Sequence, residues 1–413
     1  MVSLSLEEGN WCFMRQIRFK ILLAICLLAC VFFLNGCWGK REVEELAPLM
    51  GVGIDLGQTP GKLLITEQYA LPRKGAAAAE VEARTYSIEA ASGREINEKT
   101  SEILKRVPFM GSLKVIVIGE DAARTGFNDI LDFAQRFSEF RRSIYLIVTK
   151  GKAQDFLNLK LPNDELPSMY LISKLEMAGN ISTFPKISLG HYLTVLGREN
   201  TAPILPAVEI INSGEGGIEF QVGSKDGGQE ARIEGAGVLK GDQLVDFLTD
   251  KETKGYMWLE NDIKYRFLNT VGSPDNNVYF GGHVLKSRTK YKVIDNHGTK
   301  GLQYQIRTSV AVDEVLGLRQ RLSDTEWGEL MRGAEEKFAN VITTECQLSI
   351  QKERKLGLDY LGIGRHIEEL NPAYWESIKG HWEKEIANFP VLINVQVSVH
   401  NSGMSNSSVT TRY

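Results

Sequence analysis

A short apolar run near the N-terminus constrains this chain more than any other feature. Ile21 to Leu34 is apolar at all 14 positions and follows a basic cluster of Arg15, Arg18 and Lys20. A helix that crosses a bilayer needs about 17–25 apolar residues, so this run is short for a permanent span. Its length and basic flank are typical of the hydrophobic part of a secretory signal peptide. The sequence therefore predicts export of the rest of the chain.

The residues directly after the run predict how the signal ends. Leu34-Asn35-Gly36-Cys37 places an aliphatic and then a small residue before a cysteine, the pattern at which bacterial lipoproteins are acylated and cleaved. Residues 1–36 are then a lipoprotein signal peptide. Cys37 is the lipidation site, and acyl chains such as palmitate hold the protein on the membrane. The alternatives are an ordinary secretory signal or an N-terminal membrane helix. Glu7 and Glu8 before the basic cluster leave Met1 and Met14 as candidate start sites.

Composition narrows the class of protein. The chain has 413 residues, of which 43% are hydrophobic and 24% charged, which is typical of globular proteins and predicts two to three domains. A net charge of −4 disfavours binding to nucleic acid. After cleavage only Cys37 and Cys346 remain, so no internal disulfide is expected, and Cys346 is predicted to be a buried structural thiol. No cysteine or histidine spacing fits a metal site.

Periodicity in the first half predicts strands and helices in alternation. A continuous apolar strand, an amphipathic helix and a second apolar strand at 113–119, 127–137 and 143–149 suggest a βαβ crossover and an α/β core. Further strands are expected at 46–56, 63–71, 83–90 and 204–211, and further helices at 93–106, 167–177 and 188–196.

The second half begins with a glycine-rich stretch at 213–228, which is a candidate linker or long hairpin. Strands are predicted at 233–239, 278–285 and 302–312. Ser323 and Glu326 form the pattern of a capping box and begin an amphipathic helix, and Asn371-Pro372 begins another helical segment. Alternating apolar residues from Val391 to Val399 predict a final strand with one packed face, as in an antiparallel sheet.

A search for catalytic motifs gives no positive result. None of the six histidines has the spacing of a known metal motif, and the chain has neither a nucleophile elbow nor a P-loop. Gly362 and Gly364 are predicted to turn the chain between two helices rather than to bind a dinucleotide. Trp375 and Trp382 are predicted to be core residues rather than a stacking site for a ligand. We therefore expect no enzyme activity, cofactor or metal, and the ligand-binding residues stay unknown.

An ordered series of short motifs resembles the Ger(x)C family, the lipoprotein (C-type) subunits of bacterial spore germinant receptors. The series runs along nearly the whole mature chain. It comprises Cys37-Trp38-Gly39-Lys40-Arg41-Glu42-Val43-Glu44-Glu45-Leu46, Gly51-Val52-Gly53-Ile54-Asp55, Lys114 to Glu120, Arg136, Arg141, Val148-Thr149-Lys150-Gly151-Lys152-Ala153, Gly235-Ala236-Gly237-Val238, Glu252-Thr253-Lys254-Gly255, Leu358 to Gly364, Pro372, Trp375 and Trp382.

The resemblance implies an α+β fold of three domains, with mixed and antiparallel sheets flanked by helices. We place an N-terminal α/β domain at 38–212, a middle domain or linker segment at 213–290 and a C-terminal α+β domain at 291–413. It also implies a non-catalytic subunit anchored on the extracytoplasmic face of the cell membrane, in the inner membrane of the spore. Its implied partners are the polytopic A-type and B-type membrane subunits of a nutrient germinant receptor. Cys37 is the one functional residue that the resemblance assigns.

Two other functions stay open on the residues alone. An extracytoplasmic lipoprotein could capture a small nutrient in a cleft, as solute-binding proteins do. A lipid-anchored hydrolase is the other alternative, and the missing nucleophile motifs disfavour it.

Overall fold

The computed structural model describes residues 18–22, 24, 42, 45–72, 81–137, 139–161, 165–215, 229–270, 278–318 and 322–400. Residues 47–413 form one compact unit, and residues 1–46 form another. Cys37 and the predicted signal peptide cleavage site lie outside the described residues.

Within the described ranges, the first part of the chain forms a nine-stranded mixed sheet in the order β3-β2-β1-β5-β6-β7-β8-β9, with β4 beside β1. Its centre is parallel, because β1, β5, β6 and β7 run in the same direction, and its outer strands are antiparallel. The strands are β1 (Leu46–Leu56), β2 (Leu63–Pro72), β3 (Val81–Ala90), β4 (Val107–Phe109), β5 (Val115–Gly119), β6 (Tyr145–Thr149), β7 (Ile204–Asn212), β8 (Gln229–Lys240) and β9 (Gln243–Leu248).

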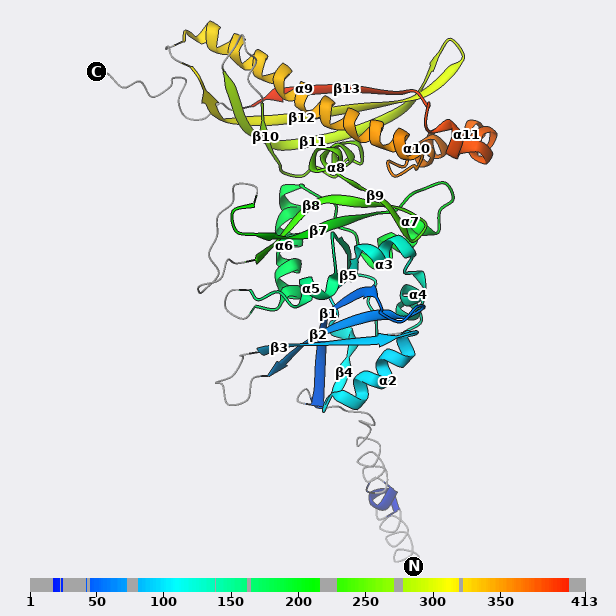
Figure 1. Ribbon diagram of the computed structural model, residues 1–413. Helices are drawn as coiled ribbons and strands as arrows, with labels where there is room; N and C mark the ends of the chain where they lie inside the picture. Colours follow the sequence, from blue (N-terminus) through cyan, green and yellow to red (C-terminus); the bar gives the residue numbers. More distant parts are fainter. Residues whose placement is uncertain are drawn as a thin grey trace, which may run out of the picture. The chain divides into compact units, whose positions relative to one another are not determined.

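Helices cover both faces of this sheet (Figure 1). One face packs against α5 and α6, and the other packs against α2, α3, α4 and α7, so the central strands are buried on both sides. The helices are α2 (Gly93–Ile103), η2 (Met110–Ser112), α3 (Glu120–Thr125), α4 (Asn128–Arg136), α5 (Ala153–Leu157), α6 (Pro167–Ile181) and α7 (Leu189–Leu196).

A four-stranded sheet in the order β10-β11-β12-β13 follows, again within the described residues. Figure 1 shows the long helix α9 running along this sheet. Its core is shared with α8 to α12 and with side chains of β7, β8 and β9. The elements are α8 (Asp250–Leu259), β10 (Phe267–Asn269), β11 (Tyr279–Asn296), β12 (Thr299–Leu316), α9 (Asp324–Leu356), α10 (Ile363–Leu370), α11 (Pro372–Ile378), η5 (Lys379–His381), α12 (Trp382–Glu385) and β13 (Val391–Val399).

The sequence signals for helix starts are confirmed by specific hydrogen bonds. Ser323 and Glu326 form the capping box of α9. Asn371, directly before Pro372, caps α11: its side chain accepts a hydrogen bond from the backbone N–H of Tyr374. Such caps satisfy backbone N–H groups that have no partner inside the helix. The βαβ prediction is also correct, because β5 and β6 pair in parallel with the connection containing α4 between them. The α+β class with mixed and antiparallel sheets is confirmed.

Two local predictions need correction. The final strand alternates as predicted, but β13 pairs with β12 in parallel rather than antiparallel. β13 lies at the edge of the sheet, and an edge strand can have one exposed and one packed face in either a parallel or an antiparallel pair. The helical segment that begins at Asn371-Pro372 is not one helix but α11, η5 and α12 in succession. Trp375, Trp382 and Phe389 are buried all the same.

The glycine-rich stretch joins two strands that pair with each other. β7 and β8 are antiparallel from Asn212 opposite Gln229 onwards, which favours the hairpin alternative over a linker. The proposed boundary after residue 212 therefore lies at the end of a strand whose sheet continues, and the boundary at 290 lies within β11. The division into three domains stays a prediction.

Candidate functional site

Three motifs of the first half converge on one buried carboxylate. Asp55 ends the run Gly51-Val52-Gly53-Ile54-Asp55 on β1, and its Oδ1 and Oδ2 accept hydrogen bonds from the backbone of Ala153 and Gln154, both at 2.8 Å. These donors lie at the start of α5, so Asp55 caps a helix that is distant in sequence. Burial raises the pKa of Asp55, although the two backbone bonds oppose the change.

The second and third motifs approach the same carboxylate. A Cβ atom on Gly119, the last residue of β5, would lie 2.0 Å from Asp55 Oδ1, so no larger residue fits there in this arrangement. The backbone of Glu120 donates to the carbonyl of Gly151 at 2.9 Å, in the loop that leads to α5. The motifs at 51–55, 114–120 and 148–153 therefore join β1, β5 and β6 to α5, and their role is structural.

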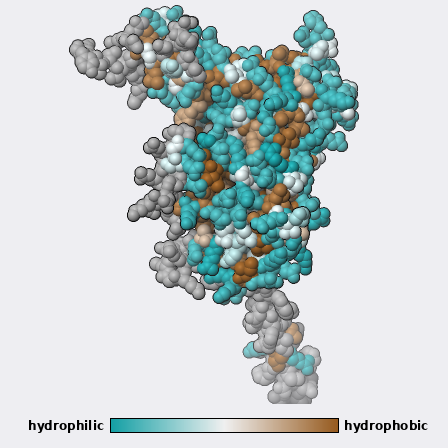
Figure 2. Space-filling view, viewed as in Figure 1, coloured by the Kyte–Doolittle hydropathy of each residue, from teal (hydrophilic) through white to brown (hydrophobic). Residues whose placement is uncertain are grey.

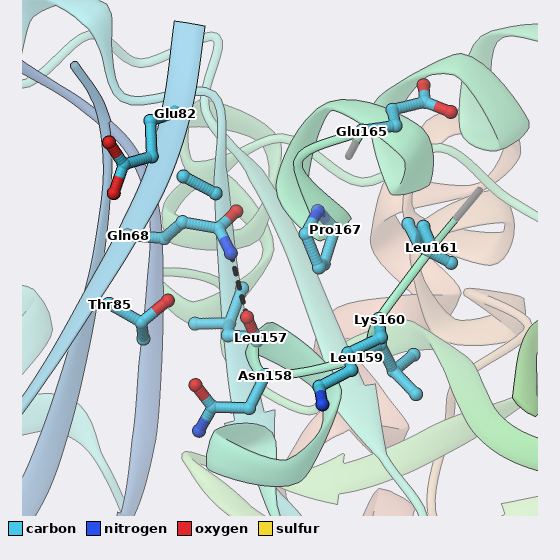
Figure 3. A pocket seen from close by; sticks show the side chains of 11 residues that line it. Gln68, Glu82, Thr85, Leu157, Asn158, Leu159, Lys160, Leu161, Glu165 and Pro167 are labelled. Carbon is cyan, nitrogen blue, oxygen red and sulfur yellow. Dashed lines mark hydrogen bonds between the residues drawn. The ribbon is translucent and has the colours of Figure 1, made fainter. Parts of the chain in front are cut away.

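An open cleft of about 560 Å³ lies beside this region (Figure 3). It lies between β2, β3 and the connection from α5 to α6. Gln68 on its wall is fully buried: its amide donates to Leu157 O at 2.7 Å and accepts from Ser168 N at 3.0 Å. Both ends of this amide are thus occupied by the protein backbone, and Gln68 holds α5 and α6 against β2.

The remaining polar groups of the cleft carry mixed charge. Figure 3 shows the carboxylates of Glu82 and Glu165 on opposite sides of the cleft, with Lys160 and Asn158 on its wall. Its volume lies in the range that binds small molecules. Among the described residues that line it, Thr85 has the one hydroxyl and none is a histidine, so a hydroxyl nucleophile beside an imidazole base is not present among them. The carboxylates, the Lys160 ammonium group and the Asn158 amide are polar groups of the kind that bind a small polar ligand.

The motif from Leu358 to Gly364 forms a second polar centre, which is buried. Asp359 accepts three hydrogen bonds: from Ile363 N and Gly364 N, both at 2.7 Å, and from Trp382 Nε1 at 2.9 Å. Gly362 has a φ of 62° and lets the chain turn into α10, as predicted. Asp359 thus caps α10 and connects it with α12.

Glu353 at the end of α9 lies next to Asp359 in the same buried centre. Its Oε1 accepts from Leu361 N at 2.9 Å, whereas Oε2 has no hydrogen-bond partner among the described residues. Burial, together with the charge of Asp359, raises the pKa of Glu353 well above its ordinary range. Burial also raises the pKa of Asp359, and its three hydrogen-bond donors oppose this rise, so the donors favour the negative charge on Asp359 and the proton on Glu353.

Glu260, Arg365 and His366 form the side of this centre that faces α8. Arg365 Nη2 donates to Glu260 Oε2 at 2.8 Å and to His366 Nε2 at 3.0 Å. Because guanidinium has donors only, Nε2 must accept, and the ring proton lies on Nδ1, 3.2 Å from the Tyr304 hydroxyl. Burial and then Arg365 lower the pKa of His366 to about 3. Burial raises the pKa of Glu260 to about 7, and Arg365 opposes this rise.

These two shifts predict a pH dependence of stability. His366 binds its proton more weakly in the folded state, so it makes stability rise with pH between about 3 and 6.5. Glu260 binds its proton more tightly in the folded state, so it makes stability fall as pH rises from about 4.5 to 7. Glu260→Gln removes the second effect. Its free energy of unfolding should therefore rise by about 1–2 kcal/mol more than that of the wild type between about pH 5 and 6.5.

Urea unfolding at a series of pH values measures this difference. Glu368→Gln is the matched control, because Glu368 is exposed on α10, the helix that carries Arg365, and should leave the pH profile of the wild type unchanged. Parallel profiles for Glu260→Gln and the wild type would show that Glu260 does not titrate in this window.

The other residues named from sequence have structural places. Cys346 is fully buried on α9, and burial raises the pKa of its thiol well above the ordinary value, so the predicted structural thiol is confirmed. Trp375 and Trp382 are buried and contact each other edge to face, with ring centroids 5.4 Å apart. Lys150 pairs with Glu209 at 3.0 Å. Cys37 lies outside the described residues, and its lipidation stays a prediction.

Sequence reasoning missed the buried carboxylates Glu353 and Asp359, the half-buried Glu260, and also Gln68. The run Leu358-Asp359-Tyr360-Leu361 does place an acidic residue between apolar ones, which is a signal for a buried cap. Glu353 gives no such signal, because it stands in the charged sequence Gln351-Lys352-Glu353-Arg354-Lys355.

Two further kinds of site are absent from the described part of the chain. No cluster of three or more His, Cys, Asp or Glu side chains in those ranges could hold a metal ion. Among the same residues, no helix combines the length and apolar composition that crossing a bilayer requires. Hydrophobic patches on the face shown in Figure 2 are small and separated by hydrophilic ones.

Comparisons with known proteins bear on both halves of the chain. Residues 39–210 match the spore germination protein N-terminal domain, and residues 234–403 match the spore germination B3/GerAC-like C-terminal domain. Spore germination protein KC of Bacillus subtilis (strain 168) is 26% identical over 404 residues, which cover 94% of this chain and 98% of that protein. Spore germination protein B3 of the same organism is 24% identical over 396 residues, covering 94% and 97%.

A solved structure shares the fold. The crystal structure of the GerBC protein aligns with a TM-score of 0.53 at 20% identity, covering 85% of this chain and 97% of that chain. The two domain matches together cover most of the chain, and they describe germination proteins rather than a known enzyme family. The resemblance seen in the sequence is therefore correct, and the chain belongs to the Ger(x)C family of spore germination proteins.

Proposed function

We propose that this protein is a lipid-anchored, extracytoplasmic subunit of a nutrient germinant receptor, and that it acts through contacts with polytopic membrane subunits rather than by catalysis. The observation that carries the proposal is the match to spore germination domains in both halves of the chain. Full-length similarity to protein KC supports it, since 98% of that protein is covered.

The membrane attachment in this proposal rests on the sequence around Cys37. Acyl chains contribute about 0.8 kcal/mol per buried CH₂, and two or more chains suffice for stable anchoring. Tethering confines the protein to the plane of the membrane, so that a weak contact with a membrane partner becomes effectively intramolecular. The family motifs around Asp55 and Asp359 maintain the fold, so the contacts are expected to come from exposed surfaces.

Cys37→Ala should abolish incorporation of radiolabelled palmitate and should release the protein from spore membranes or lower its level. The physical reason is that the thiol is the attachment point of the lipid. The rate of nutrient-triggered germination should fall together with the amount of membrane-bound protein. Labelling, membrane fractionation and germination rate are measured on the same spore preparations.

Cys30→Ala is the matched control, because Cys30 lies in the same apolar run but outside the cleavage pattern. This variant should keep label, membrane association and germination. If Cys37→Ala germinates and fractionates like the wild type, the proposal fails.

The cleft beside Gln68 favours a second candidate, capture of a small nutrient. It has the size and the mixed charge for a zwitterionic ligand, with Lys160 opposite carboxylates. A thermal shift of the full chain with amino acids, lost in Lys160→Met, would favour this candidate over a subunit that makes protein contacts alone.

A further inference from the structure

One face of the four-stranded sheet is covered with basic side chains. Lys286, Arg288, Lys290 and Lys292 occupy alternate positions on β11, and all four are exposed. The residues between them face the helices: Thr289 is buried, and its hydroxyl donates to the carbonyl of Trp258 on α8 at 2.6 Å. Arg307 on β12 lies opposite Arg288 and adds a fifth cation. We call these five residues the basic face.

The basic face contains a pairing that costs stability. Arg288 and Arg307 are direct neighbours across the two strands, and like charges at such positions repel. The Arg307 guanidinium donates to the Gln396 amide at 3.1 Å, which orients it but does not neutralise it. None of the five cations has an ion-pair partner among the described residues. β13 beside them carries no charged residue from Val391 to Val399.

The positive charge of the basic face is opposite in sign to the net charge of the chain. The protein has a net charge of −4, and the stretches 286–292, 303–309 and 391–399 together contain no acidic residue. We propose that the basic face binds an acidic polypeptide segment of a partner protein. The inference rests on the proposed receptor role for the identity of that partner, and on charge complementarity for its chemistry.

The groups between the cations favour a polypeptide over an anionic bilayer. Gln303, Gln305, Asn394 and Gln396 lie on the same face, in register with the basic residues. Their amides offer acceptors as well as donors, and peptide N–H groups can donate to those acceptors, whereas phosphate oxygens cannot. Alternate residues of a strand lie about 7 Å apart, so the cations match alternate carboxylates of an extended segment. Arginine forks also suit bidentate binding of carboxylates.

The test uses the full chain in detergent and a fluorescein-labelled peptide of alternating glutamate and serine, followed by anisotropy. The Arg288→Gln/Arg307→Gln variant should bind this peptide about tenfold more weakly, the effect of two exposed ion pairs. The same variant should melt at an equal or higher temperature at low salt, because it loses the repulsion. A merely structural role for the arginines would lower the melting temperature instead.

Matched controls separate the possible outcomes. Arg94→Gln removes an exposed cation from α2 and should bind the peptide like the wild type. A glutamine–serine peptide should not bind. The lipid arm uses vesicles of phosphatidylglycerol and phosphatidylcholine after the detergent is removed, and the variant and wild type carry the same N-terminal segment. A loss of phosphatidylglycerol binding in the variant, with no peptide binding by either protein, would overturn the proposal in favour of a lipid surface.

Unchanged peptide affinity in the Arg288→Gln/Arg307→Gln variant would also overturn it. These results are independent of palmitate labelling at Cys37, so failure of the basic face and failure of the proposed anchoring are distinguishable. Co-purification of the two polytopic subunits with the wild type but not the variant would identify the acidic partner.

Discussion

Asp359→Asn should lower the free energy of unfolding by about 3–5 kcal/mol, because it disrupts a buried charge that three donors surround. The carboxylate accepts from Ile363 N, Gly364 N and Trp382 Nε1, each at 2.7–2.9 Å. An asparagine has one acceptor oxygen, and its NH₂ group would face at least one of these donors. Denaturant unfolding followed by tryptophan fluorescence measures the loss, and Trp382 reports on the site directly.

Glu353→Gln is the control that tests where the charge resides. The raised pKa of Glu353 favours its neutral form in the folded protein, and glutamine has nearly the same shape with a carbonyl oxygen for Leu361 N. Its stability should lie within about 1 kcal/mol of the wild type. If Glu353→Gln proved the more damaging of the two variants, the negative charge would lie on Glu353 and the assignment would be reversed.

Gly255→Ala is expected to cost about 3 kcal/mol or more, because α8 and α9 approach each other at this glycine. A Cβ atom there would lie 2.1 Å from the backbone oxygen of Glu345 and 2.7 Å from its carbonyl carbon. Backbone atoms cannot rotate away as a side chain can, so the helices would have to separate. Their separation would also stretch the hydrogen bonds that Glu345 accepts from Trp258 at 2.9 Å and Arg266 at 2.6 Å. Thermal unfolding measures the loss.

Gly328→Ala makes the same chemical change where space is free. Gly328 is exposed on α9, and no described atom of another segment lies within 4 Å of the position that an alanine Cβ would take there. Alanine has a higher helix propensity than glycine, so this variant should be about 0.5–1 kcal/mol more stable than the wild type. Equal effects of the two substitutions would mean that the contact between α8 and α9 is looser than the structure places it.

Local patterns predicted the elements well where the local signal and the packing agree. The strands at 46–56 and 113–119 and the capping box at Ser323 follow from apolar runs and helix caps, and all are present. The direction of β13 does not follow from its alternation, because an edge strand has the same two faces in a parallel or antiparallel pair. The division of the 372–389 segment into α11, η5 and α12 also does not follow from its apolar spacing, which stays the same across the breaks.

The candidate site could be predicted only in part, because its contacts depend on how separate segments pack. The motifs around Asp55 and Asp359 are visible in the sequence, but both donors to Asp55 and the Trp382 donor to Asp359 lie on other segments. Those of Asp55 are about a hundred residues away, at Ala153 and Gln154. The alternating cations Lys286, Arg288, Lys290 and Lys292 are visible in the sequence, but Arg307 meets Arg288 only through the register of β11 and β12.

The amino-acid sequence by itself determined the family, the predicted lipid attachment at Cys37 and most of the helices and strands, because each depends on residues that are neighbours along the chain. Only the tertiary structure decided which carboxylates are buried, in which direction burial shifts their pKa values, and how the cations of neighbouring strands meet on one exposed face. Those properties depend on desolvation and on distances between segments far apart in sequence, and these are established when the sheets pair and the helices pack on them.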